Sequence, residues 1–141
     1  MIKLSENFSL NEFLYSDTAK KKGIDNRPCV QVIDNLKWLA IDIMQPVRNK
    51  FGIVLITSGF RCATLNKAVG GQPSSQHLYG QACDFIVPQA NPKTVFEYIK
   101  NNLDFDQLLF EYDSKGNRWM HVSHRHDGKN RHQAFYNYKS S

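Results

Sequence analysis

Residues 75–84 read Ser-Gln-His-Leu-Tyr-Gly-Gln-Ala-Cys-Asp, and they are the most informative part of the chain for both its fold and its chemistry. The apolar run that begins at Ala82 predicts a strand over residues 82–87. Because strand side chains alternate between two faces, Asp84 shares a face with Ala82, and Cys83 points to the opposite face as a buried apolar residue. Burying a carboxylate is costly unless it is paired or binds a metal, so Asp84 is a candidate ligand.

Residues 118–124 read Arg-Trp-Met-His-Val-Ser-His, and they place His121 inside a second predicted strand. His77 precedes the strand of Asp84, so the intervening loop can fold its imidazole back toward the carboxylate. A lone strand histidine is more often a hydrogen-bonded structural residue than a ligand, but His77 and Asp84 change that balance. Two histidines and one carboxylate predict a three-ligand zinc site. Its fourth position is left for water, which is the pattern of a catalytic zinc ion.

The remaining patterns predict an α+β fold, with helices in the first half of the chain and strands mainly in the second. A Ser-x-x-Glu capping box predicts a helix that starts near Leu10, and apolar residues three and four apart predict a longer one. Further helices are expected over residues 18–22, 32–47, 63–68 and 92–101, and strands over residues 53–57, 82–87, 107–112, 119–123 and 133–138. Pro46 should kink the long helix or begin a new turn, and Gly52 should end it.

Turn-forming residues at 113–117 predict a hairpin that joins strands 107–112 and 119–123. The β-branched run at 53–57 is expected to be a buried strand. A length of 141 residues suits one domain. We therefore expect a single domain over residues 1–141, with N-terminal helices packed on a small antiparallel sheet.

The composition excludes several classes of protein. A hydrophobic fraction of 41% excludes a disordered chain, and no apolar run is long enough for a membrane span. The net charge of +5 favours anionic partners, but no nucleic-acid-binding motif is present, so no nucleic-acid partner is expected. Three cysteines without CxxC spacing argue against a disulfide framework. The N-terminus lacks the apolar core of a secretory signal, so the chain is expected to be cytoplasmic as synthesised.

The motif Ser75-x-His77-x-x-Gly80-x-Ala82-x-Asp84, with Trp119-x-His121 downstream, resembles the signature of the zinc D-Ala-D-Ala carboxypeptidase family of metallopeptidases. Further segments resemble the small, single-domain members of that family, and the similarity runs to about residue 123. These segments are residues 8–13, 16–19, 57–61, 65–66 and 69–71.

The resemblance implies the small α+β fold with an antiparallel sheet that is also seen in the hedgehog signalling domain. Members of the family cut peptide bonds next to D-amino acids in bacterial cell-wall peptides. Carried over by position, the family's zinc ligands are His77, Asp84 and His121, with one zinc ion per chain.

Three other residues receive roles from the resemblance or from their place in the sequence. Arg61 matches a family arginine that binds a substrate carboxylate or steadies the oxyanion, the alternative being a surface cation at a strand end. Ser75 is expected to hydrogen-bond substrate or to hold its loop. His124 is either a solvated loop residue, like His126 and His132, or a substrate contact near the metal.

One position departs from the family pattern. Several members of the wider family have a general-base carboxylate three residues before the last histidine, where this chain has Arg118. Glu111 is the candidate replacement. If Asp113 pairs with Asn117 in the hairpin, Glu111 lies across from Trp119 and diagonally from the ligand histidine. A slip of one residue would move Glu111 to the other face, and its alternative role is an ion pair with Arg118.

The leading hypothesis is therefore a zinc metallopeptidase that hydrolyses a peptidoglycan stem peptide or cross-link. It would act as a monomeric D,D-carboxypeptidase or endopeptidase on the cell wall, and the missing signal suits a phage or prophage lysis enzyme. The alternative is a non-catalytic, zinc-containing binding module on the same fold, which the arginine at position 118 keeps open.

Overall fold

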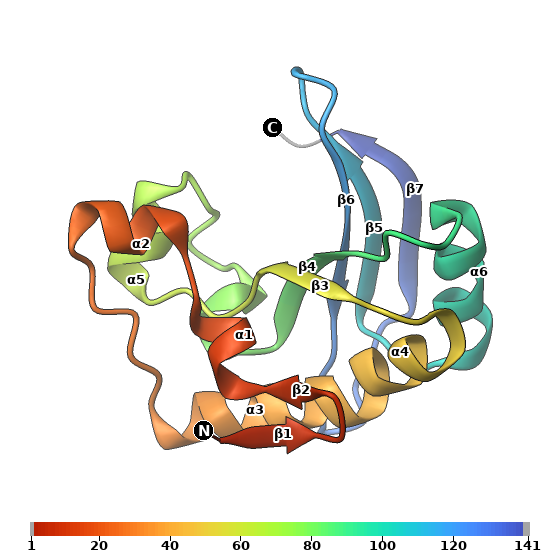
Figure 1. Cartoon of the computed structure of the whole chain (residues 1–141), viewed down its shortest axis with the longest axis horizontal. Helices are drawn as coiled ribbons and strands as arrows, with labels where there is room; N and C mark the ends of the chain where they lie inside the picture. Colours follow the sequence, from red (N-terminus) through yellow and green to blue (C-terminus); the bar gives the residue numbers. More distant parts are fainter. Residues whose placement is uncertain (1, 140–141) are drawn as a thin grey trace.

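A computed structural model describes residues 2–139 of the chain. Its helices surround a sheet whose strands run from yellow (β3) through green (β4) to blue (β5, β6 and β7) in Figure 1. The α+β class is confirmed. In chain order the elements are β1 (Lys3–Ser5), β2 (Phe8–Ser9), α1 (Leu10–Leu14), α2 (Asp17–Lys22), α3 (Val30–Leu39), the π-helical η1 (Ala40–Met44), α4 (Gln45–Phe51), β3 (Leu55–Ser58), α5 (Ala63–Ala68), the 3-10 helix η2 (Gln76–Tyr79), β4 (Ala82–Ile86), α6 (Pro92–Asn102), β5 (Gln107–Tyr112), β6 (Arg118–Ser123) and β7 (Gln133–Lys139).

The local signals that start and stop the short helices act as predicted. The Ser9 N–H donates to the Glu12 carboxylate at 2.7 Å, which is one half of a capping box at the start of α1. Gly23 ends α2 in the left-handed conformation, at φ 64°. The Asn91 side chain accepts from the Lys93 N–H at 2.9 Å and caps α6. The short β1–β2 hairpin was not predicted, because its strands have only three and two residues.

The long helical segment changes its hydrogen-bonding pattern in the middle. The elements α3, η1 and α4 follow one another without a break, and the π-helical turn lies just before Pro46. In an α-helix each carbonyl accepts from the N–H four residues later. Proline has no N–H, so Pro46 cannot donate to the Asp42 carbonyl. The predicted irregularity is thus present as a π-helical turn, and Gly52 ends the segment at φ 90°.

The main sheet has the strand order β3-β4-β6-β5-β7. Its first three pairings are antiparallel, and the β5–β6 hairpin joins the predicted strands. The expectation of an antiparallel sheet is wrong at one edge, because β7 pairs with β5 in parallel. Strand β6 ends beside the start of β5. The loop over residues 124–132 therefore only has to pass that end of the sheet before β7 runs alongside β5.

The strand predicted over residues 53–57 also differs from expectation. The observed strand β3 starts later, at Leu55, and it lies at an edge of the sheet. Ile53 is 51% exposed and Leu55 47% exposed, whereas Val54 is 6% exposed and belongs to the core, so only one side of this run is buried. A short apolar run does not distinguish a central strand from an edge strand, and here the edge position decides.

The two faces of the strands β4, β6 and β5 have different surroundings. One face belongs to the core, where α3, η1, α4 and α6 contribute apolar side chains. The fully buried strand residues on this face are Cys83, Phe85, Val122 and Leu108. Side chains alternate along a strand, so the opposite face carries the other set, which includes Asp84, His121 and Glu111. The apolar core thus packs against one face of these strands, and the polar side chains lie on the opposite face.

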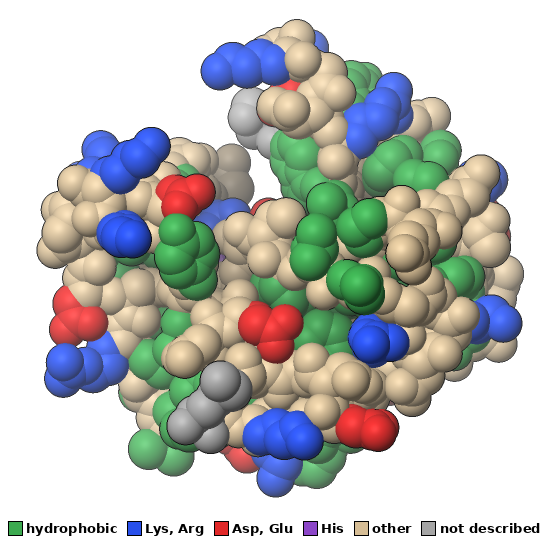
Figure 2. All heavy atoms as spheres, viewed as in Figure 1, with side chains coloured by type: hydrophobic (Ala, Val, Ile, Leu, Met, Phe, Trp, Pro, Cys, Tyr) green, Lys and Arg blue, Asp and Glu red, His purple; other side chains and the backbone are tan. Residues whose placement is uncertain are grey.

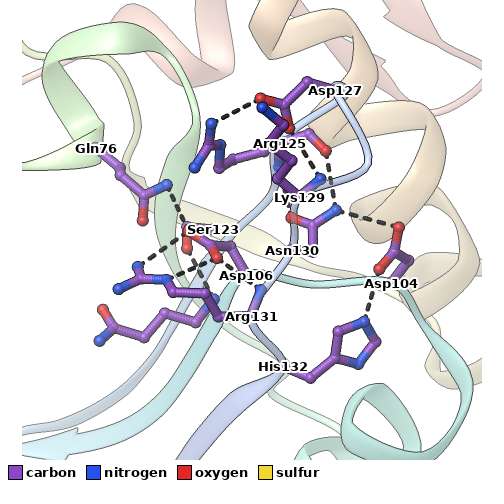
Figure 3. A network of polar contacts seen from close by, with 11 residues as sticks. Gln76, Asp104, Asp106, Ser123, Arg125, Asp127, Lys129, Asn130, Arg131 and His132 are labelled. Carbon is purple, nitrogen blue, oxygen red and sulfur yellow. Dashed lines mark hydrogen bonds and ion pairs between the residues drawn. The ribbon is translucent and has the colours of Figure 1, made fainter.

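A network of polar contacts attaches the loop 124–132 to the start of β5 (Figure 3). The Asp106 carboxylate is buried, and its two oxygens accept from Arg131 Nε at 2.9 Å and Nη2 at 3.0 Å. It also accepts from the Arg131 backbone N–H and from the Gln76 side chain, both at 2.9 Å. Asp106 therefore joins the loop before β7 to the turn that precedes β4.

No helix within residues 2–139 is both long and apolar enough to cross a membrane.

We predict that Arg131→Leu lowers the free energy of unfolding by about 3 kcal/mol, since it leaves a buried carboxylate without its cation. Urea denaturation followed by circular dichroism measures the change. The matched control is Arg125→Leu, which breaks an exposed pair with Asp127 and should cost less than about 1 kcal/mol. Equal losses in the two variants would contradict a stabilising role for the Asp106–Arg131 pair.

Candidate metal centre

The polar face of the sheet forms one wall of an open cleft of about 620 Å³. The opposite wall is the loop over residues 69–77, which follows α5. Figure 2 shows the surface hollowed between the part of the molecule that carries α2 and α5 and the β5–β6 hairpin. Six of the predicted site residues line this cleft together. They are Arg61, Ser75, His77, Asp84, Glu111 and His121.

Asp84 and His121 are brought together by strand register. They are directly opposite in the antiparallel pairing of β4 and β6, so their side chains leave the same face of the sheet. His121 Nδ1 lies 2.9 Å from Asp84 Oδ1. A shift of one residue would have sent one side chain into the core instead.

His77 reaches the same carboxylate from the 3-10 helix η2. Its ring is buried, with Nδ1 2.7 Å from the Gly59 carbonyl and Nε2 3.4 Å from Asp84 Oδ1. Gly59 lies so close to α1 that an added Cβ would be 2.4 Å from the Phe13 carbonyl oxygen, which requires a glycine there. Gly80 ends η2 at φ 71°, a conformation that glycine adopts at little cost.

The donor atoms of His77, Asp84 and His121, which we call the cleft cluster, suit a zinc ion. A carbonyl oxygen only accepts, so His77 Nδ1 carries the proton and Nε2 presents a lone pair to Asp84. Two lone pairs that face each other favour a cation between them. The separations of 2.9 Å and 3.4 Å between the histidine nitrogens and Asp84 Oδ1 lie near the distance of about 3.3 Å between ligands of a tetrahedral zinc ion.

The electrostatics of the cleft cluster favour the protonation states that a metal requires. Burial lowers the pKa of the His77 imidazole, and Asp84 only partly opposes this, so the ring favours its neutral form. Burial alone would raise the pKa of Asp84, but His77 and His121 hold it well below its usual range. Neutral imidazole and ionised carboxylate are the ligand forms of both side chains.

Arg61 is fixed at the edge of the cleft cluster. Its Nη2 lies 3.5 Å from Asp84 Oδ2, while Nε and Nη1 donate to Ser58 and Asn66 at 3.2 Å and 3.3 Å. Burial lowers the pKa of Arg61, and the nearby Asp84 opposes that shift. The side chain is 15% exposed, so it is not the surface cation considered as its alternative.

Glu111 lies on the cleft side of the hairpin. The Asp113 N–H donates to the Asn117 carbonyl at 3.1 Å, and Glu111 pairs with Trp119, which is the predicted register. Trp119 Nε1 donates to Glu111 Oε2 at 3.1 Å. Burial raises the pKa of the Glu111 carboxyl, and His121 only partly offsets this effect.

Two neighbours of Glu111 bear on its alternative role. The Arg118 guanidinium lies over the Phe110 and Tyr112 rings, on the other side of the hairpin, and donates to Asn137. Among the contacts of the described residues, Glu111 is therefore joined to Trp119 and not to Arg118.

The structure separates Ser75 and His124, the two other predicted substrate contacts. The Ser75 hydroxyl accepts from the His77 N–H at 3.2 Å and caps η2, so it holds the loop, and it also lines the cleft. His124 is buried, with Nδ1 2.7 Å from the Asp104 carbonyl and Nε2 3.0 Å from Asp42. It is not among the described residues that line the cleft.

None of the three cysteines is among the described residues that line the cleft. Cys83 is fully buried beside the Met44 sulfur, on the core face of β4 as predicted, and burial raises its pKa well above the ordinary value. Cys29 is exposed and Cys62 partly buried, and all three are free thiols.

Sequence reasoning missed several residues that shape the cleft. The Gly59 carbonyl orients His77, while Arg131 and Tyr138 line the far end of the cleft. Gly59 lies in the segment 57–61 that resembles the family, but no local signal shows that its carbonyl faces an imidazole. Arg131 and Tyr138 reach the cleft only because β7 lies beside β5.

Comparison with known proteins agrees with this geometry. A family model described as Peptidase M15 matches residues 6–123, which include the whole cleft cluster. No curated protein matches the chain. The M15 family is that of the zinc D-Ala-D-Ala carboxypeptidases, whose members are zinc-dependent metallopeptidases. With the family match covering most of its length and the three ligand-type side chains converging in one cleft, the chain belongs to the peptidase M15 family.

Proposed function

We propose that this protein is a zinc-dependent peptidase that hydrolyses D-amino-acid-containing peptide bonds of bacterial peptidoglycan. The observation that carries the proposal is the cleft cluster, beside which Arg61 and Glu111 lie in one open cleft. His77, Asp84 and His121 would hold the ion. Bound zinc supplies Lewis acidity, which polarises a carbonyl group and lowers the pKa of water toward about 7.

The protein's own residues supply the proton transfers and the orientation of the substrate. Glu111 is a partly buried carboxylate on the wall of the cleft, with one oxygen held by the Trp119 N–H. It is placed to take a proton from water and to return it to the leaving amine. Its raised pKa brings the carboxyl closer to neutral pH, where proton transfer in both directions is most effective.

Arg61 is proposed to bind an anionic group of the substrate. Its guanidinium is already oriented by Ser58 and Asn66, so little side-chain entropy remains to be lost on binding. A planar fork is the natural partner of a terminal carboxylate. Its pairing with Asp84 also keeps a proposed metal ligand in place. Arg61 would therefore contribute both to substrate binding and to the metal site.

The alternative, a non-catalytic binding module, rested on the arginine at position 118. The position of Glu111 favours the catalytic function over that alternative, because its carboxylate would supply a base from the neighbouring strand. Digestion of isolated peptidoglycan by the zinc-loaded protein, followed by mass spectrometry of the muropeptides, tests the two functions. Loss of terminal D-alanine indicates a carboxypeptidase and loss of cross-linked species an endopeptidase. An unchanged muropeptide profile would contradict the proposed activity.

We predict that His121→Ala releases the zinc ion of the cleft cluster and abolishes turnover, because only two ligands remain. Metal analysis after dialysis against a zinc buffer measures the loss, and circular dichroism checks the fold. His132→Ala, a change at an exposed histidine outside the cleft cluster, is the control and should retain the metal. If His121→Ala binds as much zinc as the wild type, His121 is not a ligand.

We predict that Arg61→Lys raises KM by about tenfold on a substrate with a free terminal carboxylate, since a point charge replaces a bidentate fork. Steady-state kinetics measures the change, and the zinc content should stay the same. On a substrate whose terminal carboxylate is amidated, the wild type and Arg61→Lys should have the same KM, which would support the assignment. Unaltered KM on the free carboxylate would exclude this role for Arg61.

We predict that Glu111→Gln keeps the zinc ion and the fold while kcat falls by about 10²–10⁴-fold, because the amide cannot accept the proton. Asp113→Asn, a carboxylate in the adjacent turn, is the matched control and should retain most of the activity. Near-normal turnover by Glu111→Gln would mean that another residue is the base.

A further inference from the structure

A second group of metal-binding side chains lies outside the cleft. Asp42 on η1 faces His124 and His126, which follow β6, and one donor atom of each lies within 4.8 Å of the other two. We call these three residues the helix cluster. The donor atoms of the cleft cluster likewise lie within 4.8 Å of one another, and nothing in the proposed peptidase function uses the helix cluster.

One ring nitrogen of His124 is hydrogen-bonded to a backbone carbonyl, as is common in metal-binding histidines. Its Nδ1 lies 2.7 Å from the Asp104 carbonyl oxygen, which can only accept, so Nδ1 carries the proton. In its neutral form the ring would present the Nε2 lone pair to Asp42 Oδ2, which lies 3.0 Å away. Its backbone N–H donates to the Gln81 carbonyl at 2.8 Å, so the residue has little freedom to turn away.

The cleft cluster shows the same arrangement. His77 also directs Nδ1 to a backbone carbonyl, at 2.7 Å, and Nε2 to a carboxylate oxygen, at 3.4 Å. A hydrogen bond from one ring nitrogen fixes the tautomer and aims the other nitrogen at the metal. Two lone pairs held 3.0 Å apart, as in His124 and Asp42, require a cation or a proton between them.

The position of Asp42 follows from the irregular helix. It lies in the middle of the π-helical turn, and π-helical turns occur frequently at functional sites. Among the described residues, the ion pairs of Asp42 are with His124 and His126 alone, and neither lysine nor arginine neutralises it. The carboxylate is therefore free to serve as an anionic ligand.

His126 completes the set on the solvent side. Its ring stacks on Trp38 with the centroids 3.8 Å apart and the planes 3° from parallel, and Nδ1 lies 3.9 Å from Asp42 Oδ2. Trp38 precedes Asp42 by four residues, about one turn of helix, and so holds the imidazole beside the carboxylate. The histidine also borders an open hollow, which gives an ion a route from solvent.

We propose that Asp42, His124 and His126 bind a second divalent transition-metal ion, of the class of Zn²⁺. Imidazole nitrogens with one carboxylate oxygen are the donors that zinc accepts, and three protein ligands leave room for water. The ion joins the helical segment of the first half of the chain to the loop that precedes β7. This site does not depend on the proposed peptidase activity, because it shares no ligand with the cleft cluster.

Metal stoichiometry tests the proposal. Metal-free protein is dialysed against a zinc buffer, and bound zinc is measured by mass spectrometry. We expect about two ions per chain for the wild type and about one for Asp42→Asn or His126→Ala, both changes at positions open to solvent. His121→Ala should also retain about one ion, and the double variant with Asp42→Asn should retain none. A single ion in the wild type, or two in Asp42→Asn and His126→Ala, overturns the second site.

The chain offers matched controls for both variants. Asp34→Asn removes an acidic residue from the same helical segment but from outside the helix cluster, and it should keep both ions. His132→Ala removes a histidine that is 49% exposed, close to the 52% of His126, and it should also keep both. Loss of an ion in either control would mean that zinc is held by general surface charge, which overturns the assignment.

Trp38 fluorescence reports on the helix cluster alone once Trp119 is replaced by phenylalanine. Paramagnetic Co²⁺ should quench this fluorescence with a saturable titration, and adding Asp42→Asn should remove the saturable phase while the Trp38–His126 stack remains. A response to pH without any response to Co²⁺ or Zn²⁺ would identify a proton between His124 and Asp42. That result overturns the metal site.

Discussion

The register between β4 and β6 fixes which side chains enter the core and which face the cleft. With Asp84 opposite His121, the neighbouring residues Cys83 and Met120 must point into the core, because side chains alternate along a strand. The same pairing therefore fills one face with apolar contacts and places ligand-type side chains on the other. Since the core holds the register, a polar and strongly charged cleft exists on a sheet that could not be stabilised by that face alone.

The cleft cluster shows how a small domain keeps buried charge in place. Asp84 is surrounded by His77, His121 and Arg61, and each of these side chains is fixed by a second partner or by strand pairing. His77 depends on the Gly59 carbonyl, which in turn lies against α1. The N-terminal helices thus position the site although they contribute no ligand to it.

Much of the fold was predictable because its signals are local. The capping box at Ser9, the glycine after α2, the proline at the start of α6 and the turn residues at 113–117 each act within a few residues. The alternation of side chains around Asp84 and His121 likewise follows from strand geometry. Counting residues from the hairpin turn puts Glu111 opposite Trp119. The family resemblance added which of these polar residues belong together.

The types of most elements, the position of the hairpin turn and the candidate ligands His77, Asp84 and His121 could be predicted, because periodicity, capping and turn chemistry are short-range properties and the motif resembles that of a family. The hairpin register could be predicted only on the condition that Asp113 pairs with Asn117, which the structure shows. The edge position of β3, the parallel pairing of β7 with β5 and the approach of His124 to Asp42 across 82 positions appear only in the folded chain. These features depend on how separate elements pack against one another. No local pattern encodes such packing, since the energy that selects it comes from contacts between residues far apart in the chain.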